Sequence, residues 1–216
     1  MEYVIRRSTR ARRVRITVQT DGTVVVVLPQ RAAERHAAAA VKELTPWIER
    51  RLAEVERQRA TLAERGNTVP YLGRTLTLVP EEGRRSVRQR LDVLLVPVDQ
   101  EQQRHALELW YRRQAQREVS ARLDAACTRA GLSYSGLTIR NQRTRWASCS
   151  AKRGMSFNWR LLLAPEDILD YVVWHEVCHL QVMDHSPRFW SLLASYLPGY
   201  ERPRAWLRRH GSTLVL

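Results

Sequence analysis

The sequence contains little cysteine and no long hydrophobic run. Only Cys127, Cys149 and Cys178 occur among 216 residues, and no two of them form a CxxC pair. This excludes a disulfide framework and predicts reduced thiols. No apolar run reaches the roughly 18 residues that a membrane span needs, and the first residues lack the apolar region of a signal peptide. We therefore expect a cytoplasmic protein with no membrane partner.

Lysine is nearly absent, although the chain is strongly basic. The formal net charge is +14, and Lys42 and Lys152 are the only lysines among 36 basic residues. Such an excess of arginine predicts attraction to a polyanion, such as nucleic acid, nucleotide phosphates or an acidic protein. The alternative is a solvated surface in a proteome biased toward arginine. The composition does not decide between these two interpretations.

Residues 1–98 are predicted to form a β-rich N-terminal domain with one helical segment. The apolar and β-branched runs predict strands, and an Asp21-Gly22 turn separates two of them. A helical pattern in the same domain contains Pro46, which predicts two helices or a kink. The predicted strands span 4–6, 14–18, 24–28, 75–79 and 91–96, and the helical pattern spans 31–63.

A dense basic cluster lies between Arg6 and Arg15, with six arginines in ten residues. As an exposed strand edge, this cluster would bind phosphate readily. Charge on an edge strand also prevents aggregation. We favour the second interpretation slightly.

Residues 99–216 are predicted to form a second domain, which makes the fold α+β. Asp99 and Gln102 predict a capping box at the start of a long helix, and Gly131 predicts its end near Ala130. Three β segments are expected at 137–141, 145–150 and 155–161, and the last alternates between apolar and polar residues. A strand at this place, just before the next helix, could offer a free edge to an extended peptide.

The motif Trp174-His175-Glu176-Val177-Cys178-His179 predicts a metal site on that next helix. Residues four apart share a helix face, so His175 and His179 point the same way and can bind one divalent metal. His185 follows six residues later and could be a third ligand. Three protein ligands leave a position for water, as a catalytic zinc site requires, and Glu176 could take the proton of that water.

The helix is expected to start at Ala164-Pro165 and to be apolar nearly all round. Burying two histidines and a glutamate without partners would cost about 1–3 kcal/mol for each group, and a metal removes that cost. In the alternative interpretation the histidines bond to backbone carbonyls, but the third histidine argues against it. Because three histidines complete a ligand set, we expect Cys149 and Cys178 to be small buried residues rather than ligands.

The C-terminal motifs resemble a known family. They are Arg145-Trp-Ala-Ser-Cys-Ser, Phe157-Asn-Trp-Arg, Asp170-Tyr-Val-Val, His175-Glu-x-x-His179 and Asp184-His185-Ser-x-x-Phe189-Trp190. Together they resemble the YgjP-like metal-dependent hydrolases, which look like bacterial relatives of the WLM and SprT-type zincin peptidases.

This resemblance implies a zincin-like C-terminal metallopeptidase domain with an HExxH active-site helix, following a β-rich N-terminal domain. It implies that His175, His179 and His185 bind the metal and that Glu176 is catalytic. The histidine spacing also equals that of the metzincins, but Val182 stands where they require glycine, so that assignment is rejected.

The resulting hypothesis is a zinc metallopeptidase that uses Glu176 as general base on a metal-bound water. Protein or peptide substrates are expected, and one divalent ion is the expected cofactor. Zinc is the default ion, although three imidazoles also take nickel, manganese or cobalt. The candidates for substrate binding are Arg145, Asn158, Arg160 and Tyr171.

Two alternatives stay open. One is a nucleoside triphosphate pyrophosphatase with the same metal site, which the arginine excess would suit, although the chain lacks a Gly-rich phosphate loop. The other is a protease recruited to nucleic acid by its basic N-terminal domain, which predicts salt-dependent binding that survives loss of the metal.

Overall fold

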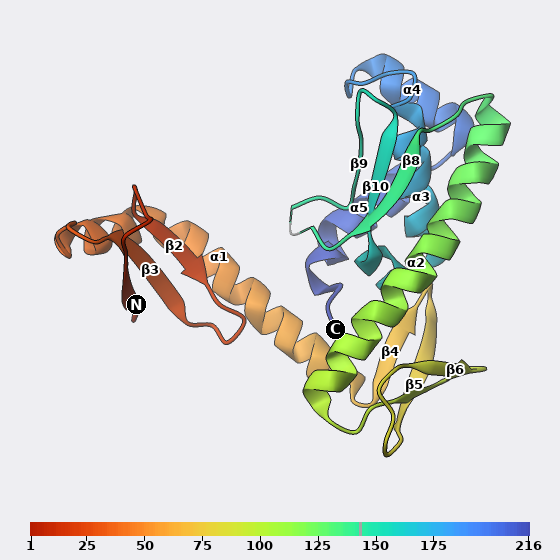
Figure 1. Cartoon of the computed structure of the whole chain (residues 1–216). Coiled ribbons are helices and arrows are strands. Elements are labelled where there is room, and N and C mark those ends of the chain that lie inside the picture. Colours follow the sequence, from red (N-terminus) through yellow and green to blue (C-terminus); the bar gives the residue numbers. More distant parts are fainter. Residues whose placement is uncertain (143) are drawn as a thin grey trace. The chain divides into compact units, whose positions relative to one another are not determined.

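The computed structural model of the protein describes residues 1–142 and 144–216 (Figure 1). The chain divides into two compact units, Met1–Glu64 and Arg65–Leu216. This division differs from the boundary expected after residue 98. The physical reason is that the strands after residue 65 contribute Val69, Leu76 and Leu94 to the core of the second unit.

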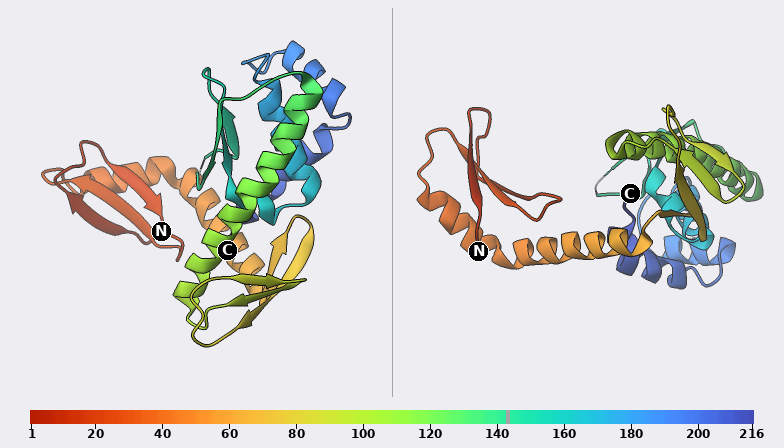
Figure 2. Two further views of the ribbon diagram at one scale, coloured as in Figure 1. Left: turned by 45° about the vertical axis from the view of Figure 1, so that its right-hand side comes forward. Right: turned by 90° about the horizontal axis from the view of Figure 1, so that it is seen from below.

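The first unit is a three-stranded sheet with one long helix. Its elements are β1 (Val4–Ser8), β2 (Arg15–Val18), β3 (Val24–Pro29) and α1 (Arg35–Arg65). The strand order is β1-β3-β2, in which β1 runs parallel and β2 antiparallel to β3. Alternate strand residues such as Ile16, Val26 and Leu28 pack against α1 through Val41 and Ile48. The helix therefore covers one face of this sheet (Figure 2).

Pro46 does not divide α1, so the expectation of two separate helices is wrong. The helix runs without interruption from Arg35 to Arg65. Proline at position 46 removes only one backbone bond of the helix, the one to the Lys42 carbonyl four residues back. Burial of Val41 and Ile48 on either side of Pro46 supports the continuous helix.

The second unit begins with a four-stranded sheet and a long helix. The elements are β4 (Thr68–Tyr71), β5 (Arg74–Pro80), β6 (Arg88–Arg90), β7 (Val93–Val96) and α2 (Gln100–Ala130), and the strand order is β4-β5-β7-β6. Asp99 accepts a hydrogen bond from Gln102 N at 2.9 Å, and Gly131 ends the helix with a φ of 65°. Both predicted ends of α2 are confirmed.

A second sheet of this unit has the order β8-β10-β9. It contains β8 (Gly136–Arg140), β9 (Ala147–Cys149) and the central β10 (Gly154–Asn158), which pairs parallel with β8 and antiparallel with β9. The strand expected at 155–161 ends at Asn158, because the Asn158 side chain accepts a hydrogen bond from Arg160 N at 3.1 Å and starts the 3-10 helix η1 (Trp159–Leu163).

Three helices complete the unit: α3 (Glu166–Cys178), α4 (Pro187–Tyr196) and α5 (Glu201–His210), followed by the short η2 (Gly211–Thr213). α3 is buried on most sides and packs against α2, α4 and α5. Arg122 of α2 joins it to α3 through Glu166 and Asp170. Over the described residues, none of the helices is long and apolar enough to cross a membrane.

Candidate metal centre

Two of the three histidines are placed by the local geometry of α3. His175 lies in its last turn, and His179 follows the last helical residue with φ −66° and ψ −16°, which still belong to the helical region. The His179 N–H donates to His175 O at 3.3 Å. The predicted i, i+4 relation therefore holds, although the helix formally ends at Cys178.

The third histidine reaches the same point from the segment before α4. His175 Nε2 lies 3.2 Å from His179 Nε2 and 3.0 Å from His185 Nε2. Among the described residues these three form a group whose ligand atoms all lie within 4.8 Å of one another. Two nitrogens at a tetrahedral zinc ion, each about 2.0–2.1 Å from it, are about 3.4 Å apart. The two separations measured from His175 Nε2 are within a few tenths of an ångström of that value.

Neighbouring groups fix the orientation of two of these imidazoles. Val182 O lies 3.0 Å from His179 Nδ1, so a proton on Nδ1 leaves the Nε2 lone pair directed at the cluster. Trp190 Nε1 donates to His185 O at 2.9 Å, and its indole stacks on the imidazole. The fully buried Phe189 ring lies 4.6–4.9 Å from all three imidazoles and forms the floor of the site.

The electrostatics of the cluster favour the neutral form of His175 and His179. Burial, together with the adjacent His179 and His185, lowers the pKa of His175 to about 3. Burial also lowers the pKa of His179. Metal ions bind the neutral form of imidazole, so the protonation state of these rings suits a ligand role.

Glu176 follows His175 in α3 and is buried. Its side chain is 5% exposed, and its Oε2 has no hydrogen-bond partner. Burial raises its pKa to about 8, and a backbone hydrogen bond from Cys149 opposes that rise. A carboxyl group with a pKa near neutrality can both accept and release a proton.

These observations together test whether a divalent cation fits. An unpaired buried carboxylate oxygen and three converging ring nitrogens are costly without a positive partner. A cation at the nitrogens would relieve both costs. The donor set of three imidazoles is one that zinc uses in catalytic sites, so the residues fit the ion.

Cys178 lies within the motif and Cys149 lies on β9, which packs against α3, but neither thiol belongs to the histidine group. Both thiols are free, and Cys178 is fully buried. Burial raises the pKa of Cys149 to about 11 and that of Cys178 to about 12. Protonated thiols are poor ligands.

Three of the four predicted substrate-binding residues have contacts outside the histidine cluster. Asn158 is 2% exposed, and its Nδ2 donates to Gln142 O at 2.7 Å and to Arg145 O at 3.4 Å. Arg160 donates to Asn141 Oδ1, and the Arg145 side chain is exposed. Asn158 therefore holds the backbone of the segment that leads into β9.

Tyr171 is the candidate that lies next to the cluster. It precedes His175 by one helical turn, its ring centroid is 5.9 Å from that of His175, and it is 6% exposed. Burial raises its pKa to about 12, so its hydroxyl is a hydrogen-bond donor at neutral pH.

No role was predicted from the sequence for two further residues near the histidine cluster, Trp190 and Arg204. The Arg204 guanidinium lies 4.1 Å from the Trp190 ring centroid, and its charge lowers the pKa of both His175 and Tyr171. Trp190 belongs to the motif that contains His185, so its spacing after His185 could have predicted a contact between the two residues. Arg204 lies on α5, far along the chain from the motif, and no sequence pattern indicated it.

The match of the chain to a protein-family model agrees with this chemistry. The family model described as "YgjP-like, metallopeptidase domain" matches residues 12–210. The structure of the abylysin metallopeptidase zymogen from Pyrococcus abyssi is similar at 26% identity and a TM-score of 0.37, covering 42% of this chain and 90% of that one. The jannalysin zymogen from Methanocaldococcus jannaschii gives 19% identity, a TM-score of 0.38, and 43% and 94% coverage. No curated protein matches significantly.

Proposed function

Because the chain belongs to the YgjP-like family of metallopeptidases and is a metal-dependent hydrolase, we propose that it is a zinc peptidase with His175, His179 and His185 as ligands. One observation carries the proposal. His179 Nε2 and His185 Nε2 lie 3.2 Å and 3.0 Å from His175 Nε2, and the next residue in the chain, Glu176, has a buried carboxylate oxygen without a partner.

Each group of the site would have a separate role in peptide hydrolysis. A divalent cation would supply Lewis acidity, polarising the substrate carbonyl and making a water more acidic. Glu176 would accept the proton of the attacking water at its unpartnered Oε2 and deliver it to the leaving amine. The Cys149 N–H, bonded to the carboxylate, would hold Glu176 in position.

The second donor to the developing oxyanion is proposed to be Tyr171. It is buried, protonated and one helical turn from His175. Arg145 and Arg160 are less suitable, because one is exposed and the other is engaged with Asn141. A hydroxyl donor aimed at the oxyanion is worth about 10²–10³ in kcat.

The substrate backbone is proposed to bind along the free edge of β9. Trp146 O accepts from Asn158 N, and Ser150 N donates to Gly154 O, so both residues bond toward β10. Because backbone groups alternate along a strand, those of Ala147 and Cys149 point away from β10. The hydrogen bond between the Cys149 backbone and Glu176 supports this edge as the substrate site, and Ala147 would then pair with a peptide.

The test compares two variants and two substrate classes. Metal content of the purified protein should fall in His179→Ala and stay at the wild-type level in Glu176→Gln. Casein cleavage should be lost in both. His105→Ala, which alters an exposed histidine of α2, is the matched control and should retain metal and activity.

Two results would contradict the proposal. Equal metal content in wild type and His179→Ala would show that His179 is not a metal ligand and would contradict the proposed site. Cleavage of nucleoside triphosphates but not casein, with dependence on Glu176, would replace the peptidase by a pyrophosphatase.

A further inference from the structure

The face of the first unit's sheet that is turned away from α1 carries arginine. Cross-strand pairing places Arg6 of β1 and Arg15 of β2 on either side of Val27 in β3. Directly paired residues point to the same face, and their neighbours Ile5 and Ile16 point to the α1 side. Val27 is only 8% exposed although no helix covers it in this unit, because the aliphatic stems of the two arginines flank it.

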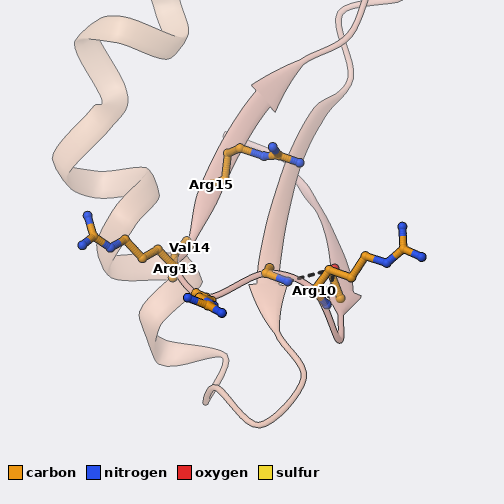
Figure 3. A pocket seen from close by; sticks show the side chains of 7 residues that line it. Arg10, Arg13, Val14 and Arg15 are labelled. Atoms are coloured by element: carbon orange, nitrogen blue, oxygen red, sulfur yellow. Dashed lines mark hydrogen bonds between the residues drawn. The ribbon is translucent and has the colours of Figure 1, made fainter.

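The connection between β1 and β2 extends this surface. It contributes Arg10, Arg12 and Arg13, all exposed. Ser8 Oγ accepts hydrogen bonds from the backbone N–H of Arg10 at 3.3 Å and of Ala11 at 3.2 Å, which gives the start of the connection a defined turn. A concavity of about 500 Å³ runs along it. Figure 3 shows Arg10 and Arg13 extending to opposite sides, with Arg15 on the adjoining strand.

We call the five residues Arg6, Arg10, Arg12, Arg13 and Arg15 the arginine surface. No carboxylate pairs with any of them among the described residues. Arg7 differs, because it bonds to Glu34 and to the carbonyls of Gln30 and Ala32 and so serves the fold. Five like charges without counter-charges repel one another, and this cost indicates an external anion.

We propose that the arginine surface binds the phosphate backbone of a nucleic-acid duplex. Guanidinium groups bind phosphate oxygens in a two-pronged geometry. A single phosphate group would need convergent donors, whereas Arg10 and Arg13 diverge. Diverging charges fit a polymer with one phosphate charge per about 1.7 Å of duplex axis.

Two observations favour a duplex over other polyanions. A second concavity adjoins the first and is lined by residues such as Arg6, Arg15 and Val27. Neither concavity is lined by an aromatic side chain, so this surface lacks the stacking platform of a single-strand binder. An acidic protein partner would need an apolar centre to its interface, but Val25 and Val27 in the central strand are 9% and 8% exposed, and the exposed Val4 beside Val25 lies on an edge strand. A charged and polar surface is typical of protein–DNA interfaces.

The experiment measures binding of the full-length protein to a labelled 20-base-pair duplex by fluorescence anisotropy over a range of salt concentrations. The test variant is Arg10→Ala/Arg12→Ala/Arg13→Ala. The control is Arg88→Ala/Arg90→Ala/Arg113→Ala, which removes three exposed arginines of the second unit. The control and the test variant therefore have the same net charge. A single strand and polyglutamate are tested in parallel.

The test variant should bind about 100-fold more weakly near 0.1 M salt, and the slope of log K against log salt should become shallower by about 2.7, which is 0.9 for each lost phosphate contact. The control should bind like wild type. Circular dichroism and casein cleavage should be unchanged in the test variant, which separates this proposal from the peptidase assignment.

Four outcomes would overturn the proposal. Equal weakening of binding in both variants would show that only the net charge of the protein matters. Unchanged binding in the test variant would show that the duplex contacts another surface. Binding to polyglutamate that depends on the same arginines as strongly would assign the surface to an acidic protein. Tighter binding to the single strand than to the duplex would exclude duplex recognition.

Discussion

Trp190 holds the main chain of His185 in place. Its Nε1 donates to His185 O at 2.9 Å, while the indole and imidazole rings stack at 5.6 Å with an interplanar angle of 29°. His185 is the exposed member of the cluster, and it comes from a segment outside α3. The hydrogen bond and the stack therefore supply the restraint that α3 gives to His175 and His179.

Trp190→Phe should keep the stacking and remove the hydrogen bond. Groups that orient a metal ligand contribute about 10–100-fold to metal affinity, so we expect zinc affinity to fall about tenfold, measured by competition with a chelator. Trp206→Phe on α5, whose ring lies against His210, should have the wild-type affinity. If the two variants bound zinc equally, Trp190 would have no positioning role.

Ala147→Pro tests the free edge of β9. Proline is tolerated on an edge strand where the N–H points away from the sheet, so the melting temperature and metal content should stay near wild type. Because the lost N–H is the one proposed to pair with the substrate backbone, kcat/KM for peptides should fall about tenfold or more. Unchanged kcat/KM in a folded variant would exclude β9 as the binding edge.

Arg122→Ala tests the ionic link between α2 and α3. The guanidinium donates to Glu118, Glu166 and Asp170. Glu166 is 62% exposed and contributes little, and Glu118 lies on α2 itself. We therefore expect a loss of about 1.5 kcal/mol from the free energy of unfolding, mainly from the contact with Asp170.

Arg112→Ala is the control for Arg122, because its partner Glu108 lies on the same helix. It should change the free energy of unfolding by no more than about 0.5 kcal/mol. Urea denaturation measures both variants, and similar losses would show that the link between helices adds nothing beyond a surface ion pair.

Gly211→Ala tests a close approach near the C-terminus. A Cβ built at this position would lie 2.9 Å from Trp146 Cζ2, whereas one at Gly136 would meet nothing within 4 Å. Overpacking costs about 1–3 kcal/mol, so Gly211→Ala should lower the melting temperature. Gly136→Ala should alter stability by only about 0.5 kcal/mol. Equal melting temperatures would mean that Trp146 moves aside freely.

Features set by neighbouring residues were predictable. The ends of α2 follow from Asp99 and Gly131, whose side chain and backbone act within a few residues. The turn at Asn158 was missed, because its alternation with Phe157 and Trp159 is also typical of a strand. Its side-chain cap, rather than the apolar pattern, ends β10.

The division of the chain was not predictable from composition. The sequence pattern of strands β4 to β7 predicted that they belong to the same domain as the N-terminal β segments. Their apolar residues instead join the core that includes α2. Which of two sheets a strand enters depends on pairing and packing between distant residues, and hydrophobic alternation is the same in both.

The sequence alone determined that His175 and His179 share a face with Glu176 between them, because hydrogen bonds four residues apart impose that spacing on any helix. Tertiary structure alone decided that His185 completes the cluster, that the Cys149 N–H meets Glu176, and that Arg6 and Arg15 flank one valine. Each of these depends on which distant segments pack together, and no short-range periodicity encodes that choice.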